Sequence, residues 1–190
     1  TIYRWNRMCY GITDNKPHMR IECRYIPAGP SIQDEIANAA FWVGLMKARP
    51  ENVKKIWEHF DFKDVKSNFF KAARSGVESV FVWRGKTISA HDLIKNELLP
   101  LAHEGLKNCG FSNEEIYVYL GTIEKRLSSS TGSQWQVRNF RNLKKEMNVS
   151  DALNALTEFM HDQQKQNTAV CAWPDIQIPA ALKKQVANMR

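Results

Sequence analysis

The sequence predicts an α+β protein that is mostly helical, with an antiparallel β-hairpin near its N-terminus packed on a bundle of helices. One observation is the strict alternation of polar and apolar residues over 18–25, which is the period of a β-strand. A second is the recurrence of apolar residues at helical spacing, behind capping residues, through most of the chain after residue 31. With 190 residues, of which 43% are hydrophobic, the chain is long enough to bury one substantial core.

The hairpin is predicted from the two residues that separate its strands. Asp14 and Asn15 both tolerate a positive φ, so they suit a two-residue turn between antiparallel strands. That turn fixes the register of the strands. It sets three cross-strand pairs, namely Trp5 with Arg24, Arg7 with Glu22, and Cys9 with Arg20.

One face of this hairpin gathers charge. His18, Arg20, Glu22 and Arg24 share a face of the second strand, and Arg7 joins them from the first. A surface ladder of charged pairs is the simpler explanation of such a pattern. Three arginines around one carboxylate are more than a ladder needs. We therefore expect Arg7, Arg20, Glu22 and Arg24 to form a site that a metal ion and a polyanion share.

The segment after the hairpin predicts a buried helix. Ser31 is the expected N-cap, with Asp34 at the capping-box position, and the helix is expected to end near Ala48, before Arg49-Pro50. Its residues are apolar almost all round, which is typical of a central helix. The apolar face of the hairpin is expected to pack on it through Met19, Ile21, Cys23 and Tyr25.

Apolar spacing and capping residues predict the remaining elements. The loop over 128–133 is interpreted either as a mobile lid over a substrate or as a loop anchored by one buried aromatic residue, Trp135. The predicted elements are helices over 53–60 and 65–73, the latter capped by Gly76, a strand over 79–83, a long helix over 89–109 kinked at Pro100, a helix from Ser112 with Glu115 in a capping box, a helix capped by Ser150, and a short helix from Pro179.

Composition narrows the class of function. A formal net charge of +7 suits nucleic acid, but the basic residues are spread along the chain and no aromatic–basic RNA signature occurs, so nucleic acid is not the expected partner. The four cysteines lack metal-ligand spacing, and a domain of this size needs no disulfide framework, which favours the cytoplasm. No apolar run approaches transmembrane length and no secretory signal is evident, so no membrane is expected.

Several motifs are shared with a known family. The strand Arg20-Ile-Glu-Cys-Arg24, followed by Pro27-Ala-Gly-Pro30 and Asn38-Ala-Ala-Phe41, resembles the carboxylate–amine ligases of the glutamine synthetase-like superfamily, and in particular bacterial glutamate–cysteine ligase-like proteins. Those proteins carry a strand of the form Arg-Ile-Glu-x-Arg, a Pro-containing turn and a buried Ala-rich helix. Residues 3–7, 99–103 and 132–136 are also similar to the family, although the specific motif lies in the first fifty residues.

The resemblance implies an ATP- and Mg²⁺-dependent (or Mn²⁺-dependent) enzyme, as in glutathione biosynthesis. The enzyme is expected to join the carboxylate of glutamate to a small amine through an acyl phosphate. By this resemblance Glu22 binds the metal, Arg24 holds the γ-phosphate in transfer, and Arg20 binds another part of ATP. Arg7 clamps phosphate or the substrate carboxylate, so the expected catalytic residues are Arg24 and Arg7. Arginine suits these roles because its planar fork binds two oxygens at once.

The resemblance also implies that the site is incomplete. Enzymes of the family use several metal carboxylates, most of them on earlier strands, and this chain offers one. We therefore expect 1–190 to be one domain, the C-terminal part of a larger catalytic domain that its missing N-terminal part completes. Residues 1–27 carry the site, 31–190 support it, and the piece alone is inactive. A non-catalytic helical domain that binds a ligand or partner is the alternative, and a homodimer is left open. The sequence does not specify the amine.

Overall fold

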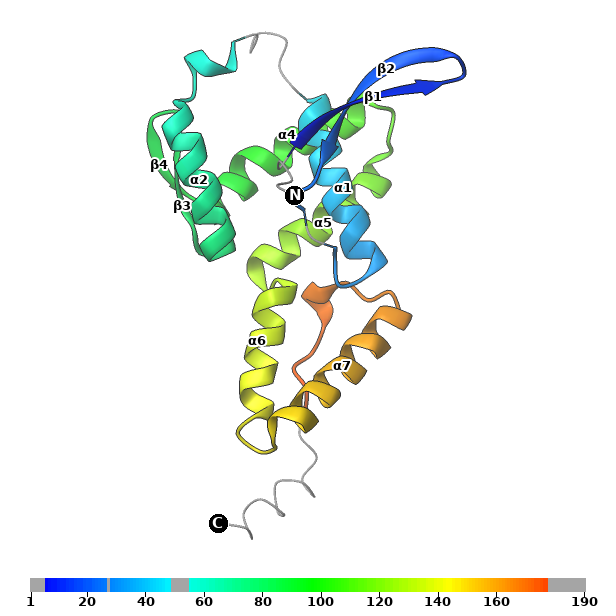
Figure 1. The fold of residues 1–190 in the computed structure, drawn as a ribbon, viewed down its shortest axis with the longest axis vertical. Coiled ribbons are helices and arrows are strands. Elements are labelled where there is room, and N and C mark those ends of the chain that lie inside the picture. The colour runs from blue at the N-terminus through cyan, green and yellow to red at the C-terminus, as the bar shows by residue number, and fades with distance from the viewer. Residues whose placement is uncertain (1–5, 27, 49–54, 178–190) are drawn as a thin grey trace.

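The computed structural model describes residues 6–26, 28–48 and 55–177, and all structural statements concern these residues. The fold is α+β and mostly helical, with an N-terminal antiparallel hairpin, as predicted. In Figure 1 the hairpin projects from the helical body, and α6 and α7 form the opposite end of the molecule. The elements are β1 (Asn6–Thr13), β2 (Lys16–Cys23), α1 (Ile32–Lys47), the 3₁₀ turn η1 (Ile56–Glu58), α2 (Phe62–Ser75), the 3₁₀ turn η2 (Gly76–Glu78), β3 (Val80–Trp83), β4 (Lys86–Ser89), α3 (Ala90–Leu93), the π-helical turn η3 (Ile94–Leu98), α4 (Leu99–Asn108), α5 (Asn113–Ser128), α6 (Gly132–Leu143), α7 (Val149–Lys165) and the 3₁₀ turn η4 (Val170–Ala172).

The hairpin has the predicted turn and register. Asp14 and Asn15 adopt φ values of 51° and 59°, as both central residues of a type I′ turn must. In the resulting pairing Arg7 faces Glu22, and Cys9 faces Arg20. The predicted pair of Trp5 with Arg24 lies outside the described residues. The turn chemistry at two positions is thus sufficient to align the two strands.

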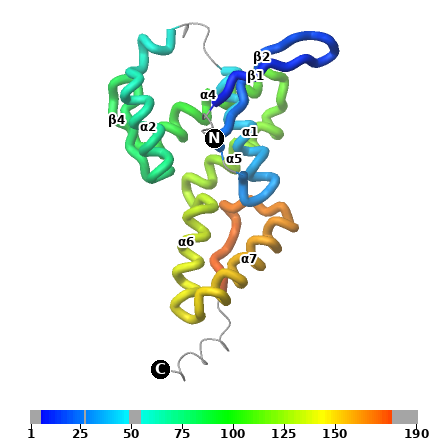
Figure 2. Tube along the Cα trace, viewed as in Figure 1, coloured from blue at the N-terminus to red at the C-terminus, as the bar shows by residue number. Residues whose placement is uncertain are grey.

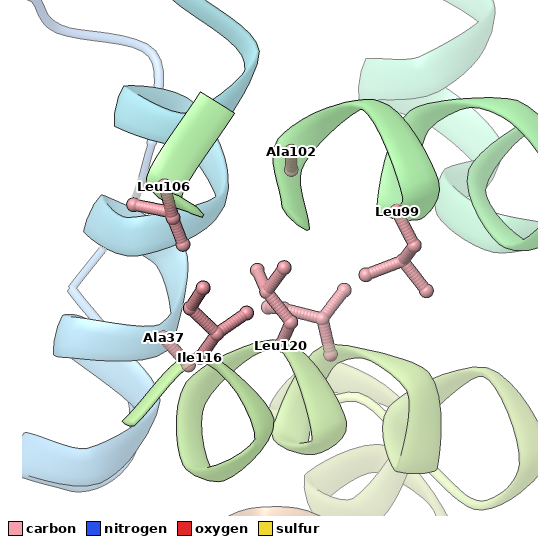
Figure 3. Close-up of a cluster of buried hydrophobic side chains, with 7 residues drawn as sticks. Ala37, Leu99, Ala102, Leu106, Ile116 and Leu120 are labelled. Atoms are coloured by element: carbon pink, nitrogen blue, oxygen red, sulfur yellow. The ribbon is translucent and has the colours of Figure 1, made fainter. Parts of the chain in front are cut away.

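The main core lies between α1, α4 and α5. The seven buried residues of this cluster include Ala37, Ala102 and Ile116, which point toward one another in Figure 3. Gly44 on α1 and Gly105 on α4 let the two backbones meet, since a Cβ on Gly105 would overlap the Gly44 carbonyl oxygen. Helix α1 is therefore central, as predicted, and packs against α4 and α5, but it is not buried all round, because Ile32, Ile36 and Met46 are exposed.

A second core holds the C-terminal elements together. Trp135 of α6 is fully buried, stacks on Phe159 of α7 and meets Trp173 edge-on at 5.1 Å between ring centroids. Its indole Nε1 donates to the Pro174 carbonyl oxygen at 3.1 Å. The segment before α6 is a capping box built on Thr131. Of the two interpretations of the 128–133 loop, these contacts support the loop anchored by a buried tryptophan.

A buried ion pair joins the two cores. The side chain of Asp34, in the first turn of α1, is 0% exposed and accepts hydrogen bonds from Arg126 of α5 at 2.8 Å and 3.1 Å. Its second oxygen accepts from the Ser31 hydroxyl and from the Val170 backbone N–H. Arg126 also donates to Asn38, which is thus a satisfied amide. The predicted Ser31 cap is confirmed, but Asp34 does much more than cap the helix.

The apolar face of the hairpin is exposed, so its predicted packing on α1 is wrong over most of its length. Cys23 does approach α1, where it lines a hollow with Trp42, and Tyr25 contacts Phe69 of α2 at 6.5 Å between ring centroids. Farther from α1 the hairpin extends past the helices, as the tube in Figure 2 shows. The exposed side chains there are Met8, Tyr10, Ile12, Met19 and Ile21.

Other predicted elements differ in detail. The helix expected over 53–60 is, where described, a single 3₁₀ turn, and Trp57 is 69% exposed instead of packed. The long helix over 89–109 is divided by a π-helical turn at Ile94–Leu98, which lies just before Pro100, where a kink was predicted. Asn148, not Ser150, caps α7. The predicted Gly76 cap and the capping box at Ser112 are confirmed. Arg49-Pro50 and the helix from Pro179 lie outside the described residues.

Candidate functional site: the charged face of the hairpin

The candidate site lies on the face of the hairpin opposite its apolar side chains. Glu22 is its centre. Glu22 Oε2 accepts a hydrogen bond from Arg24 Nη2 at 2.9 Å and from Cys9 Sγ at 3.3 Å. Arg7 lies directly across from Glu22 in the strand register. The register therefore brings Arg7, Glu22 and Arg24 together, as predicted.

Arg20 lies beside this group on the same face. Gly11 of β1 has no side chain, and the space above it is occupied by Arg20 Nη1 and by the imidazole of His18. A Cβ at this position would lie 2.9 Å from Arg20 Nη1 and 2.7 Å from His18 Nε2. Because Gly11 pairs with His18 across the sheet, these two cationic or titratable side chains fold over β1.

The electrostatics of Glu22 reflect this arrangement. The pKa of Glu22 is lowered from its ordinary value of 4.5, chiefly by the hydrogen bond from Arg24 and then by that from Cys9. Partial desolvation acts in the opposite direction, and the charges of Arg24 and Arg7 add smaller decreases. Glu22 is consequently ionised at neutral pH and neutralises part of the arginine charge.

The site is open to a ligand of some size. Arg7 and Arg20 are exposed, and the side chains of Glu22 and Arg24 keep 41% and 23% of their exposure. Three arginines and one carboxylate on the same face leave a local excess of about two positive charges, which suits a polyanion such as a phosphate chain. The donor set on this face therefore fits phosphate oxygens.

A metal ion fits the same face only if Glu22 shares it with a second ligand, such as a phosphate. The described residues contain no group of three or more His, Cys, Asp or Glu side chains that could hold a metal. Glu22 offers one carboxylate, of which Oε2 is already bonded to Arg24 and Cys9. Mg²⁺ accepts one protein carboxylate when phosphates and water supply its other ligands. A lone carboxylate such as Glu22 therefore fits a Mg²⁺ ion only when phosphate oxygens and water supply the remaining ligands.

Sequence reasoning missed two features that the structure brings out. Cys9 was predicted to face Arg20, but its thiol contact with Glu22 depends on rotamers that no pattern predicts. The Asp34–Arg126 pair joins residues 92 positions apart, and the capping role of Asp34 concealed it. A signal was present in the second case, because a helix that is apolar almost all round requires a buried acid on it to find a partner.

None of the described helices has both the length and the apolar character needed to cross a membrane.

Comparison with known proteins identifies no relative of this chain. No family model, no curated protein and no solved structure matches this chain.

Proposed function

We propose that this chain supplies the nucleotide-binding hairpin of an ATP- and Mg²⁺-dependent carboxylate–amine ligase of the glutamate–cysteine ligase-like kind. The observation that carries the proposal is that one open face holds the Glu22 carboxylate, its partner Arg24, its cross-strand neighbour Arg7, and Arg20, which lies over Gly11. These are the residues at which the sequence resembles that family. An ordinary surface strand has no need of three arginines and one carboxylate on a single face.

The proposed reaction has two steps. The γ-phosphoryl group of ATP is transferred to the carboxylate of the acceptor, glutamate, which yields ADP and an acyl phosphate. The nitrogen of a small amine then attacks the acyl carbon, a C–N bond forms, phosphate leaves and the nitrogen loses a proton. Both steps place extra charge on phosphate oxygens, so catalysis depends on positioning and charge neutralisation.

The arginines perform that neutralisation. Arg24, already held beside Glu22, binds the γ-phosphate, and Arg20, lying over Gly11, binds another part of the nucleotide. Arg7 clamps a phosphate or the carboxylate of the acceptor. When Mg²⁺ (or Mn²⁺) is bound, it neutralises phosphate charge, and Glu22 provides one of its oxygen ligands.

The proposal requires more than this chain contains. Ligases of the family that the sequence resembles use several metal carboxylates, whereas the described face offers only Glu22, so the proposal places the other carboxylates in another part of the polypeptide. We therefore propose that residues 1–190 alone are inactive. The cysteines of the described residues are free thiols, which supports a reducing cytoplasm as the compartment.

A non-catalytic binding domain is the second candidate. The exposed apolar face of the hairpin favours it, because Met8, Tyr10 and Met19 at 73%, 64% and 61% exposure suit a partner surface. Such a domain would keep the hairpin and its charge without turning over a substrate.

An activity assay separates the two candidates. A longer protein that contains this chain is incubated with ATP, Mg²⁺ and glutamate, and phosphate release is measured while the amine is varied. Amine-dependent release of phosphate together with the amide product supports the ligase. Nucleotide binding without turnover for any amine supports the binding domain, and the absence of both contradicts the proposed site.

A further inference from the structure

The two outer edges of the N-terminal hairpin differ. A two-residue turn makes Thr13 and Lys16 a hydrogen-bonded pair, and such pairs then alternate along an antiparallel ladder. The residues between them point their backbone N–H and C=O groups outward. On β2 the first of these outward positions is Pro17, which has no N–H to donate. The tip of the β2 edge is therefore blunted.

The outer edge of β1 is intact. Its outward positions are Met8, Tyr10 and Ile12, each with a backbone donor and acceptor. Among the described residues β1 pairs only with β2, and these three side chains are 73%, 64% and 64% exposed. An unpaired edge of this kind is a template for another strand.

The side chains along this edge specify the strand that fits. Met8, Tyr10 and Ile12 share the apolar face, so a strand added beside β1 places alternate side chains next to them, on the same face as Met19 and Ile21 of β2. Its other side chains fall on the charged face. There they meet Arg7 directly, and they meet Arg20 where its guanidinium lies over Gly11.

Charge decides between the candidate occupants. A second copy of the chain paired edge to edge would place two faces that each carry Arg7 and Arg20 side by side, with a net charge of +7 on each molecule. An acidic strand is complementary to the same face. We propose that the outer edge of β1 binds an extended protein segment in which apolar side chains alternate with aspartate or glutamate. This inference concerns a protein partner and does not depend on nucleotide binding.

Backbone amide exchange on residues 1–190 tests the proposal directly. Three synthetic peptides are compared: one in which glutamate alternates with valine, one of the same composition with the valines in a block, and one in which lysine replaces glutamate. The alternating acidic peptide is expected to slow exchange at the amides of Met8, Tyr10 and Ile12. The block peptide and the lysine peptide are expected to leave these amides unprotected.

Matched proline substitutions locate the edge. Tyr10→Pro removes an outward donor from β1 without removing a bond between β1 and β2, so binding of the alternating peptide is expected to weaken at least about tenfold. Ile12→Pro is expected to act in the same way. Met19→Pro makes the same change on the opposite edge, at an equally exposed position, and is expected to leave binding unchanged. Exchange at the remaining hairpin amides reports whether each variant keeps its fold.

Several results would overturn the inference. Protection of the Met19 and Ile21 amides instead of the Met8 and Tyr10 amides would show that the peptide binds the edge of β2, not that of β1. Equal binding of the block peptide would reduce the contact to general charge attraction, and protection that rises with protein concentration alone would identify a second copy as the occupant. Absence of protection by any peptide also overturns it. Titration of the same samples with ATP distinguishes the two proposals. Nucleotide binding without peptide binding overturns only this inference, and peptide binding without nucleotide binding overturns only the proposed nucleotide site.

Discussion

Glu22 and Cys9 lie on adjacent strands, and the Cys9 thiol donates to Glu22 Oε2 at 3.3 Å, the same oxygen that Arg24 contacts at 2.9 Å. Cys9 is 7% exposed, whereas Arg7 on the same strand is exposed. The thiol and Arg24 together hold the carboxylate in one place and leave Oε1 without a hydrogen bond to the described residues. Glu22 Oε1 is therefore available to a ligand that the neighbouring arginines also bind.

The first prediction concerns the titration of Glu22. Arg24→Gln removes the largest cause of its lowered pKa, so the pKa of Glu22 is expected to rise toward 4.5. Carbon-detected NMR titration of the Glu22 carboxyl measures this value. Arg84→Gln, which affects Glu97 elsewhere, is the control and is expected to leave Glu22 unchanged. An unchanged Glu22 pKa in Arg24→Gln would mean that the two side chains do not interact in solution.

The sign of the pH dependence follows from that titration. A carboxyl whose pKa is lower in the folded state favours folding when it is ionised. The contribution of Glu22 is therefore fully present above its ordinary pKa of 4.5 and is lost as the pH falls through its lowered folded value. Because Glu22 lies in solvent, salt is expected to weaken this contribution.

A second prediction concerns Arg24 in catalysis. In a longer, active protein, Arg24→Lys keeps the charge and loses the planar fork, so phosphate release is expected to fall at least about tenfold, roughly 1.4 kcal/mol of transition-state stabilisation. Arg84→Lys changes a more exposed arginine that also pairs with a glutamate, and this variant should retain full activity. Unaltered turnover in Arg24→Lys would limit this strand to a structural role.

A third prediction concerns the buried pair between Asp34 and Arg126. Arg126→Met leaves the carboxylate of Asp34 buried and without its counter-charge, and the free energy of unfolding is expected to fall by about 3–5 kcal/mol. Denaturant unfolding measures the loss. Lys55→Met breaks an exposed pair with Glu58 and is expected to cost less than about 1 kcal/mol. Equal effects of the two substitutions would show that Asp34 is not buried as described.

A fourth prediction concerns the contact between α1 and α4. Gly105→Ala is expected to destabilise the fold by about 1–3 kcal/mol or more, because its Cβ would overlap the backbone of Gly44 and Ala48. Gly121→Ala provides the control in α5. Its Cβ would have 3.9 Å to the nearest atom of Tyr117, so alanine is expected to stabilise the helix by about 0.5–1 kcal/mol. Thermal unfolding of both variants decides the matter, and a neutral Gly105→Ala would contradict the close approach.

The sequence predicts local features of this fold better than its contacts. Asp14 and Asn15 were sufficient for the hairpin register, and the Ser112–Glu115 capping box was sufficient for the start of α5, because both signals act within a few residues. The exposure of Met19 could not be predicted, since strand alternation identifies an apolar face without showing what covers it. The predicted packing of Trp57 is wrong for a related reason, because helical spacing indicates a buried face only if a helix forms.

Titration of ATP with Mg²⁺ into residues 1–190, followed by NMR, tests the central claim most directly. The account predicts weak binding that fades with added salt, with the largest changes at Arg7, Arg20 and Arg24 and their loss in Arg24→Gln. Arg141→Gln changes an arginine of α6 in a hollow that Lys145, just after the helix, also lines; this variant is the matched control and should not alter the binding. Changes that map to Arg141 and Lys145, or no change at the hairpin, would contradict the claim that this charged face binds a nucleotide.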